Sequence, residues 1–303
     1  MAEGADAGAA WENPLIPNAK LRQIYLAMTR ARSLGNALPR SQRGATLGLE
    51  ACLVSTSVDL ETGDLVSDAL AGPVVEFLRG TKLDSVLRQG KTKGGRKRGI
   101  GGRSDADCGS AARLPDVPGI QERIWAAVGA AAALKAEAAS AIIRAKAEEA
   151  TATQSGVVVV YARAGEAPRA LWRTALTFAA EQQLPAIFVV LPATRPPGSK
   201  VSARSEGGMN AFAGGCGVPG IAVDANDAVA IYRVAQESIG RARIGGGAVL
   251  MECVPFVVGG AAGKRNAASD AIAGIEHSVL NRGVATRKWM EREGKSFAKR
   301  ITR

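Results

Sequence analysis

Short apolar runs alternate with segments of helical periodicity through the second half of the chain. Residues 157–162, VVVVYA, form an uninterrupted apolar run after a Ser-Gly pair. This pattern is typical of a strand that is buried on both faces. The next segment places Leu171, Ala175 and Phe178 on one face of a helix. Further strands are predicted at PAIFVVL, GIAVDAND and GGGAVLMECVPF, and a helix that ends at Arg243 separates the last two.

Strands that alternate with helices in this order predict an α/β fold, with a parallel sheet flanked by helices and connected by right-handed crossovers. A long alanine-rich helix from Gln121 precedes the first of these strands. Asp224 or Asn226 is expected to cap the helix that follows GIAVD. Two amphipathic helices are predicted at residues 270–281 and 286–299.

The predicted organisation is a single α/β domain that covers residues 19–303. A loose tail, residues 1–18, precedes it. Within the domain, we expect a mobile basic loop at residues 88–119 and C-terminal helices at residues 270–303.

The chain has 303 residues and a formal net charge of +11, and much of this charge is local. The segment from Arg88 to Arg103 holds seven lysines and arginines without one acid. A solvated loop is one interpretation, and an acidic partner subunit, phosphate or nucleic acid are others. Because no aromatic residue lies among these charges, base stacking has no platform there.

Several classes of protein are disfavoured by the sequence. The longest apolar runs are broken by charge or glycine, so we expect no membrane span. The start, MAEGADAGAAWENP, carries acids where a secretory signal has a positive cluster, which predicts a cytoplasmic protein. The four cysteines form no Cys-x-x-Cys pair and are predicted to be buried thiols, and His277 is predicted to be a surface residue rather than a catalyst.

Four stretches share a distinctive order and together span most of residues 20–285: GLEACLVSTSVDLETGDLVSDALAGPVVEFLRG, ALTFAAEQQLPAIFVVL, GVPGIAVDANDAVAIYRVAQESIGRARIGGGAVLMEC and DAIAGIEHSVLNRG. The third is the most specific, through its Val-Asp-Ala-Asn-Asp turn and its Gly-rich return to a strand. In this order they resemble the alpha subunit of the thiamine-diphosphate-dependent dehydrogenase component of 2-oxo acid dehydrogenase complexes, of the pyruvate or branched-chain type.

The resemblance implies a thiamine-diphosphate-binding fold in which Mg²⁺ holds the cofactor diphosphate. The family's ligands are the aspartate of a Gly-Asp-Gly turn and an asparagine after the next strand, and such hard oxygen ligands suit Mg²⁺. At the matching positions this chain has Arg163-Ala164-Gly165 and Pro192-Ala193. Methyl groups therefore stand where the family has its two side-chain ligands, and an arginine lies beside them.

The other polar loops of the family are also replaced. Its Tyr-Arg-x-His motif, which contacts the diphosphate, falls on residues 70–73, and its histidine-rich loop falls on residues 256–262. These vestigial positions include Leu70, Ala71, Pro73, Gly259 and Ala261. We therefore expect no intact cofactor site, no metal site and no catalytic residue. Thiamine diphosphate and Mg²⁺ are implied by the resemblance alone.

The chain is interpreted as a catalytically degenerate relative of the dehydrogenase alpha subunit, with a structural or regulatory role. Its expected partner is a second copy or a beta-subunit-like protein. One alternative is an active alpha subunit that carries out oxidative decarboxylation with a beta partner. Another is a metal-independent module for phosphate, at Arg163 and Arg169, or for nucleic acid, at the basic loop.

Overall fold

A six-stranded sheet forms the centre of the computed structural model, which describes residues 16–39, 46–89, 109, 111–117, 119–147, 155–193, 208–255 and 270–302. The strand order is β2-β1-β3-β4-β6-β5, and every neighbouring pair is parallel. The strands are β1 (Leu65–Ser67), β2 (Ala112–Arg113), β3 (Val158–Arg163), β4 (Ala186–Leu191), β5 (Gly220–Asp224) and β6 (Val249–Val254). The predicted parallel α/β fold is confirmed.

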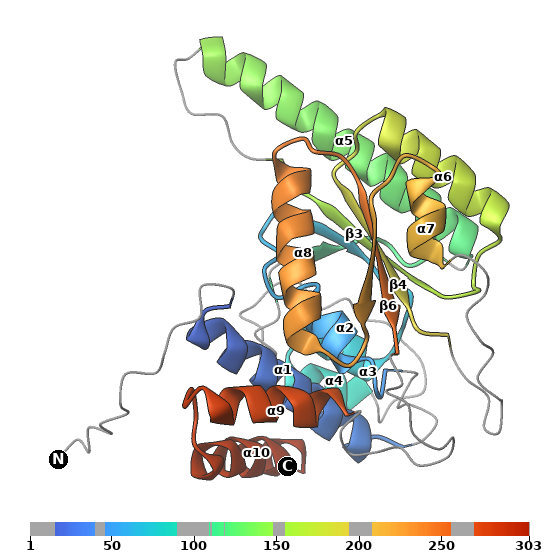
Figure 1. Ribbon diagram of the computed structural model, residues 1–303. Helices are drawn as coiled ribbons and strands as arrows, with labels where there is room; N and C mark the ends of the chain where they lie inside the picture. Colours follow the sequence, from blue (N-terminus) through green and yellow to red (C-terminus); the bar gives the residue numbers. More distant parts are fainter. Residues whose placement is uncertain are drawn as a thin grey trace.

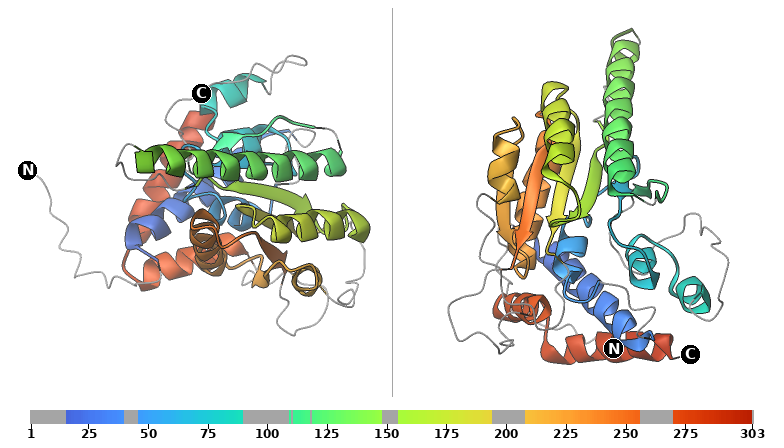
Figure 2. Two further views of the ribbon diagram at one scale, coloured as in Figure 1. Left: turned by 90° about the horizontal axis from the view of Figure 1, so that it is seen from above. Right: turned by 90° about the vertical axis from the view of Figure 1, so that its right-hand side faces the viewer.

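Ten helices surround this sheet in the part of the chain that is described. They are α1 (Asn18–Ala37), α2 (Glu50–Ser55), α3 (Pro73–Leu78), α4 (Leu83–Gln89), α5 (Ile120–Ala147), α6 (Arg169–Glu181), α7 (Met209–Gly214), α8 (Ala228–Arg243), α9 (Ala271–Asn281) and α10 (Arg287–Ile301). Helices α5, α6 and α7 cover one face of the sheet, and α8 lies on the other (Figures 1 and 2).

The buried side chains of the central strands alternate between two cores. On β3, Val158 and Val160 pack toward α5 and α6, whereas Val159 and Tyr161 pack toward α2 and α8. All four side chains are fully buried, which explains the unbroken apolar run. Trp172 is a packing residue in the first of these cores, as its ring meets that of Phe188 edge-on with the centroids 6.0 Å apart.

Only part of α5 is covered by the sheet. Its first half buries Ile124, Val128 and Ala131, but the helix extends beyond the sheet (Figures 1 and 2). The window Ile120–Ile143 is long and apolar enough for a membrane span by length and composition alone, and 17% of it is buried. Because the first half is docked on the sheet, the sequence-based expectation of no membrane span is kept as a prediction.

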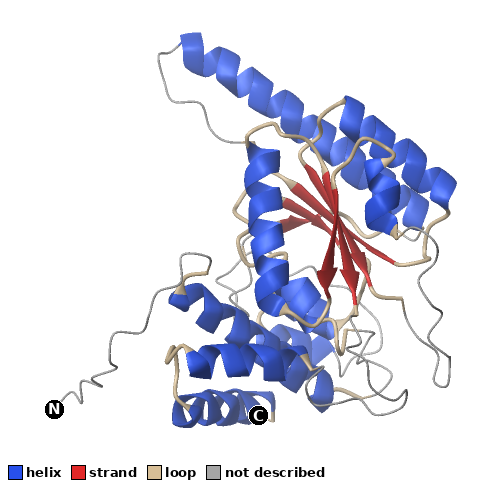
Figure 3. Ribbon diagram, viewed as in Figure 1, coloured by secondary structure: helices blue, strands red, loops and turns tan. Residues whose placement is uncertain are grey.

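Helices α1, α9 and α10 lie together at the end of the molecule toward which the strands point (Figure 3). The α1 guanidinium of Arg32 pairs with Glu50 of α2 at 2.6 Å and with Asp270, the N-cap of α9, at 3.1 Å. Arg22 of α1 donates a hydrogen bond to the carbonyl of Val284, between α9 and α10. These contacts fix the first helix of the domain against its last two.

The amino end of the sheet is closed by Asp64, which is buried and directly precedes β1. Its carboxylate accepts hydrogen bonds from the backbone N–H of Val157 at 2.9 Å and of Glu61 at 2.7 Å. It also pairs with the guanidinium of Arg243, at the end of α8, at 2.6 Å. Since Val157 directly precedes β3, one carboxylate ties together the starts of two strands and the end of a helix.

The structure corrects several details of the sequence analysis. The N-cap of α8 is Asp227, whose carboxylate accepts from the N–H groups of Val229 and Ala230, while Asp224 accepts from the N–H of Asn226 in the preceding turn. The tail predicted at residues 1–18 ends sooner, because Ile16 is buried. Strand β2 lies within the loop predicted at 88–119, and β1 and α7 were not predicted.

Candidate functional site

The turn after β3 is the position at which the sequence analysis expected a vestigial metal site. Gly165 has a φ of 78°, in the left-handed region, and reverses the chain so that Glu166 folds back over the turn. One carboxylate oxygen of Glu166 accepts from the backbone N–H of Arg163 at 2.8 Å. The other accepts from the guanidinium of Arg123, on α5, at 2.5 Å.

This arrangement places a carboxylate at the turn, one residue beyond the segment that was considered from the sequence. The Arg123 side chain is 11% exposed and that of Glu166 is 26% exposed, so the pair is largely removed from water. Both carboxylate oxygens of Glu166 already accept a hydrogen bond from the protein. Burial lowers the pKa of Arg163, and the neighbouring Glu166 partly offsets this effect.

The end of β4 lies beside this turn, as the sequence analysis expected. Arg163 pairs with Leu191 in the sheet register, and the backbone N–H of Ala164 donates to the carbonyl of Leu191 at 2.8 Å. Pro192 and Ala193 follow directly, with Pro192 half-buried and Ala193 exposed. The two predicted ligand positions, Ala164 and Ala193, therefore flank the carboxyl ends of adjacent strands.

The start of α6 carries two arginines near the same turn. Helix α6 begins after Pro168, and its first turn contains no acid. The guanidinium carbons of Arg169 and Arg173 lie 5.2 and 5.3 Å from the ring centroid of Phe212, on α7. Each arginine therefore has an aromatic neighbour. The phosphate-binding alternative at Arg163 and Arg169 stays a prediction.

The carboxyl end of β1 leads to the predicted vestigial positions Leu70, Ala71 and Pro73. Pro73 is the first residue of α3, after Gly72 with a φ of 129°. Leu70 is buried, Pro73 is half-buried and Ala71 is exposed. None of these three side chains carries a polar group that could contact a diphosphate.

The polar side chains beside this loop are already engaged in ion pairs. Asp68, whose side chain is 1% exposed, contacts the guanidinium groups of Arg79 at 2.7 Å and Arg113 at 3.2 Å. Arg79 also donates to the hydroxyl of Ser57 at 3.0 Å, and its guanidinium lies 5.2 Å from the ring centroid of Tyr161. This cluster ties β1, β2 and α3 together, which is a structural role.

Glu252 on β6 has a partner that the sequence did not identify. Its carboxylate accepts from the backbone N–H of Asn210, at the start of α7, at 2.9 Å. The predicted vestigial positions Gly259 and Ala261 lie outside the described residues.

Magnesium bound to a diphosphate requires hard oxygen ligands from the protein. In the described part of the chain, the side chains at the ends of β3 and β4 are an arginine, two methyl groups and a proline ring, and the carboxylate of Glu166 is held by Arg123 and the Arg163 N–H. Within the described ranges, no three His, Cys, Asp or Glu side chains are grouped so that they could hold a metal ion. The described residues at this end of the sheet therefore do not fit a Mg-diphosphate group.

Three of the four cysteines and the histidine occupy the places predicted for them. Cys52, Cys216 and Cys253 are buried and unoxidised, while Cys108 lies outside the described residues. A hydrogen bond with Cys253, together with burial, raises the pKa of the Cys52 thiol, which disfavours the reactive thiolate. His277 is exposed on α9 and contacts the side-chain amide of Asn281 at 2.8 Å.

Arg123 and Glu166 are the site residues that sequence reasoning missed. Arg123 lies in the first turn of a helix 40 residues earlier in the chain, so nothing local connects it with the turn after β3. The signal available for Glu166 was the preceding Gly165, since glycine allows the left-handed conformation that turns the next side chain back.

Comparison with known proteins supports the resemblance in the sequence. The family described as "Dehydrogenase E1 component" matches residues 26–303. The pyruvate dehydrogenase E1 component subunit alpha of Staphylococcus aureus is 33% identical over 109 residues, which cover 35% of this chain and 29% of that protein. The mitochondrial 2-oxoisovalerate dehydrogenase subunit alpha of Homo sapiens is 25% identical over 257 residues, covering 82% of this chain and 54% of that protein.

The corresponding protein of Pan troglodytes is 26% identical over the same length. The chain thus spans about half the length of these 2-oxoisovalerate dehydrogenase subunits, and less of the bacterial one. The family match covers most of the chain and coincides with a parallel α/β fold. The chain therefore belongs to the dehydrogenase E1 component family and is similar to its 2-oxo acid dehydrogenase alpha subunits.

Proposed function

We propose that this chain is a catalytically degenerate alpha-subunit-like protein that does not bind thiamine diphosphate with Mg²⁺ and acts as a structural or regulatory subunit. The observation that carries the proposal is the turn after β3. There Ala164 stands at the ligand position, and the one carboxylate, Glu166, is engaged by Arg123 and the Arg163 N–H.

The free energy of burying a diphosphate at the carboxyl end of the sheet supports this proposal. A diphosphate carries several negative charges, and burying them without metal or donors costs several kcal/mol. Leu70, Ala71 and Pro192 supply no compensating hydrogen-bond donor from their side chains. Glu166, which is held by Arg123 and the Arg163 N–H, cannot donate a hydrogen bond to a phosphate in its ionised form.

A subunit role is supported by the uncovered side of α5. Exposed positions on this helix recur at alternating intervals of three and four residues: Ala126, Gly129, Ala133, Ala136, Ser140 and Ile143. This spacing forms one seam along a helix, and small side chains allow another helix to approach closely. Ile143 at the end of the seam is 70% exposed. We propose that a second copy or a beta-subunit-like protein covers this seam.

Calorimetric titration tests the cofactor half of the proposal. The isolated chain, titrated with thiamine diphosphate in millimolar MgCl₂, is expected to give only the heat of dilution. A catalytically active alpha and beta pair of the same family, titrated under the same conditions, is the positive control. Micromolar binding by this chain would overturn the proposal.

Family membership favours a second candidate, an active alpha subunit that needs a beta partner to complete its site. A decarboxylation assay with 2-oxo acids, run with the beta subunit of the same organism, separates the two. Turnover above that of the beta subunit alone would support the second candidate and remove the first.

Sedimentation tests the subunit half. The chain alone, or mixed with that beta subunit, is expected to sediment as an assembly, and Ala133→Glu in the α5 seam is expected to dissociate it. Ala273→Glu, at an exposed alanine of α9, is the matched control and should leave the assembly intact. If the chain sediments as a monomer both alone and in the presence of the beta subunit, this role is excluded.

A further inference from the structure

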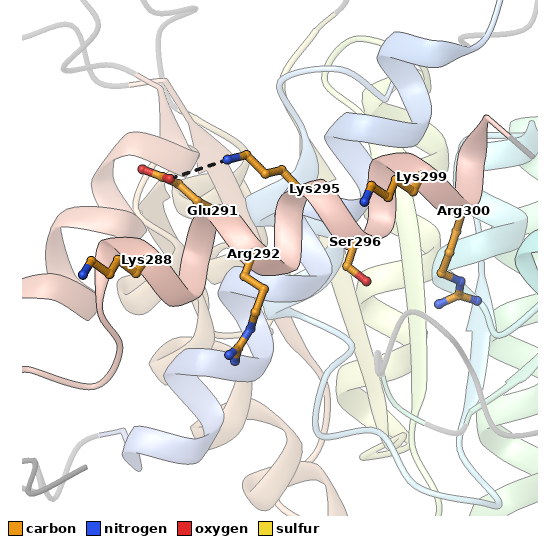
Figure 4. A pocket seen from close by; sticks show the side chains of 7 residues that line it. All are labelled: Lys288, Glu291, Arg292, Lys295, Ser296, Lys299 and Arg300. Atoms are coloured by element: carbon orange, nitrogen blue, oxygen red, sulfur yellow. Dashed lines mark ion pairs between the residues drawn. The ribbon is translucent and has the colours of Figure 1, made fainter. Parts of the chain in front are cut away.

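Helix α10 presents a basic face to solvent. Lys288, Arg292, Lys295 and Lys299 follow one another at intervals of four, three and four residues, so that they form a single stripe along the helix (Figure 4). A shallow groove of about 610 Å³ runs along this stripe, and the described residues that line it all come from α10. They include Arg300 and one acid, Glu291.

The apolar side of α10 is already used for packing within the molecule. Met290 and Phe297 are buried, and the ring of Trp289 lies 6.4 Å from that of Tyr25 on α1. The basic face therefore points away from α1. A membrane would find no large apolar side chain of α10 available for insertion, because Met290, Phe297, Trp289 and Ile301 pack in or against the core.

The stability of the helix does not account for these cations. Arg287 and Lys288 stand in the first turn, where the positive end of the helix dipole disfavours positive charge. Only Lys299 and Arg300, in the last turn, agree with the dipole.

The acids of α10 neutralise the face only weakly. Lys295 lies 3.9 Å from Glu291, and Arg292 lies 3.9 Å from Glu293, with the Lys295 and Arg292 side chains 77% and 73% exposed. Ion pairs of this length and exposure contribute little. With six lysines and arginines against two glutamates, α10 keeps an excess of four positive charges.

The side chains of the stripe, which are basic and carry no aromatic or large apolar group, favour a nucleic acid over a protein as the partner. Stable protein interfaces are anchored by aromatic or apolar side chains, and the exposed stripe of α10 has none. A nucleic acid needs no such anchor, because its backbone phosphates bind lysine and arginine through charge alone. From Lys288 to Lys299 the stripe spans roughly 16 Å, a length over which a DNA duplex carries about ten phosphates.

We propose that the exposed face of α10 binds the phosphate backbone of nucleic acid without reading its sequence. This binding does not depend on the turn after β3, so it goes beyond the proposed function and can fail or succeed separately. It also does not depend on residues 90–103 of the basic segment, which lie outside the described residues.

The test is fluorescence anisotropy with a labelled 20-base-pair DNA duplex between 50 and 200 mM KCl. The variant changes Arg292, Lys295 and Lys299 to Gln. A control changes Lys82, Lys135 and Arg233 to Gln, three exposed cations outside α10, and so removes the same charge. A labelled 20-nucleotide strand distinguishes single-stranded from duplex ligand.

We expect the parent chain to bind the duplex, with an affinity that falls steeply as salt increases. The α10 variant should lose about 2 to 3 from the slope of log K against log salt, since each phosphate contact contributes about 0.9 on duplex DNA. For the single strand the loss should be about 2, at about 0.7 per contact. The control should keep most of the slope.

Three results would overturn the proposal. The first is no binding to either probe at 50 mM KCl, and the second is an equal loss in the control, which would indicate net charge alone. The third is tighter binding to phosphatidylglycerol vesicles than to the duplex, which would indicate a membrane surface. Unchanged far-ultraviolet circular dichroism of both variants shows that the comparison is made between folded proteins.

Discussion

The acidic side chains at the two ends of the central sheet make different contacts. At the amino end, Asp64 is fully buried and accepts from two backbone N–H groups and from Arg243, so that it joins two strands to α8. At the carboxyl end, Glu166 is also paired, but it joins one turn to α5 and does not connect two strands. It lies over the turn where the family places a metal ligand.

The difference shows which polar groups the fold itself requires. Without Asp64, the N–H of Val157 and the guanidinium of Arg243 would lose their partner in the interior, so this group is needed whether or not a ligand is bound. The polar groups that would hold a cofactor are not needed for folding. Alanines such as Ala164 and Ala193 can therefore replace them at little cost in stability. In this way a chain can keep the fold of the family without its cofactor ligands.

The largest effect is expected at the amino end. Asp64→Ala removes the buried partner of Arg243, leaves the contact with the exposed Glu61, and should lower the free energy of unfolding by about 3 to 5 kcal/mol. Urea denaturation measures this change. Glu61→Ala is the matched control, because Glu61 contacts the same arginine at 3.3 Å but is 71% exposed. Its effect should stay below about 0.5 kcal/mol, and equal losses would contradict the role assigned to Asp64.

A smaller effect is expected at the carboxyl end. Glu166→Gln removes the charge that pairs with Arg123 while keeping the shape of the side chain. Because the Glu166 side chain is 26% exposed, water offsets part of the loss, and we expect about 1 kcal/mol in urea denaturation. The double change with Arg123→Met measures the coupling between the two residues. Additive effects would show that the pair does not hold the turn.

The smallest effect on stability is expected at the two positions where this chain lacks the family's metal ligands. Ala164→Asp combined with Ala193→Asn restores the side-chain types of the family. Ala193 is exposed and Ala164 is only half-buried, so stability should change by less than about 1 kcal/mol. Binding of thiamine diphosphate with Mg²⁺, followed by calorimetry, should still be weaker than millimolar, since Leu70, Ala71 and Pro73 remain. Micromolar binding by this variant would locate the whole defect at these two positions.

The central strands could be predicted from the sequence because burial on both faces leaves a pattern that is independent of the rest of the chain. The three valines that open β3 and the run AIFVVL of β4 are such cases. Strand β1 has three residues and β2 has two, too few for any periodicity, and their pairing in the sheet is decided by tertiary contacts. The N-cap of α8 was misplaced because Asp224, Asn226 and Asp227 are all favourable capping types, and only the backbone geometry selects Asp227.

The candidate site was predictable in its position but not in its contents. The alignment placed Ala164 and Ala193 at neighbouring strand ends, and the hydrogen bond from Ala164 to Leu191 places them there in the structure. The ion pair between Arg123 and Glu166 could not be predicted, because it joins residues 43 apart through packing of α5 on the sheet. Likewise, the pairing of Asp68 with Arg113 depends on β2, a strand that the sequence does not signal.

The contacts that α1 makes with α9 and with the segment before α10 have a consequence for synthesis on the ribosome. Arg32 and Asp270 are separated by 238 positions in the chain. At about 5 to 20 residues per second, translation of that interval takes roughly 10 to 50 s. For this time α1 has no α9 or α10 to pack against, and Tyr25 lacks the neighbouring ring of Trp289. A nascent chain arrested before residue 270 is therefore the form of this protein that chaperones would meet with its first helix not yet packed against α9 and α10.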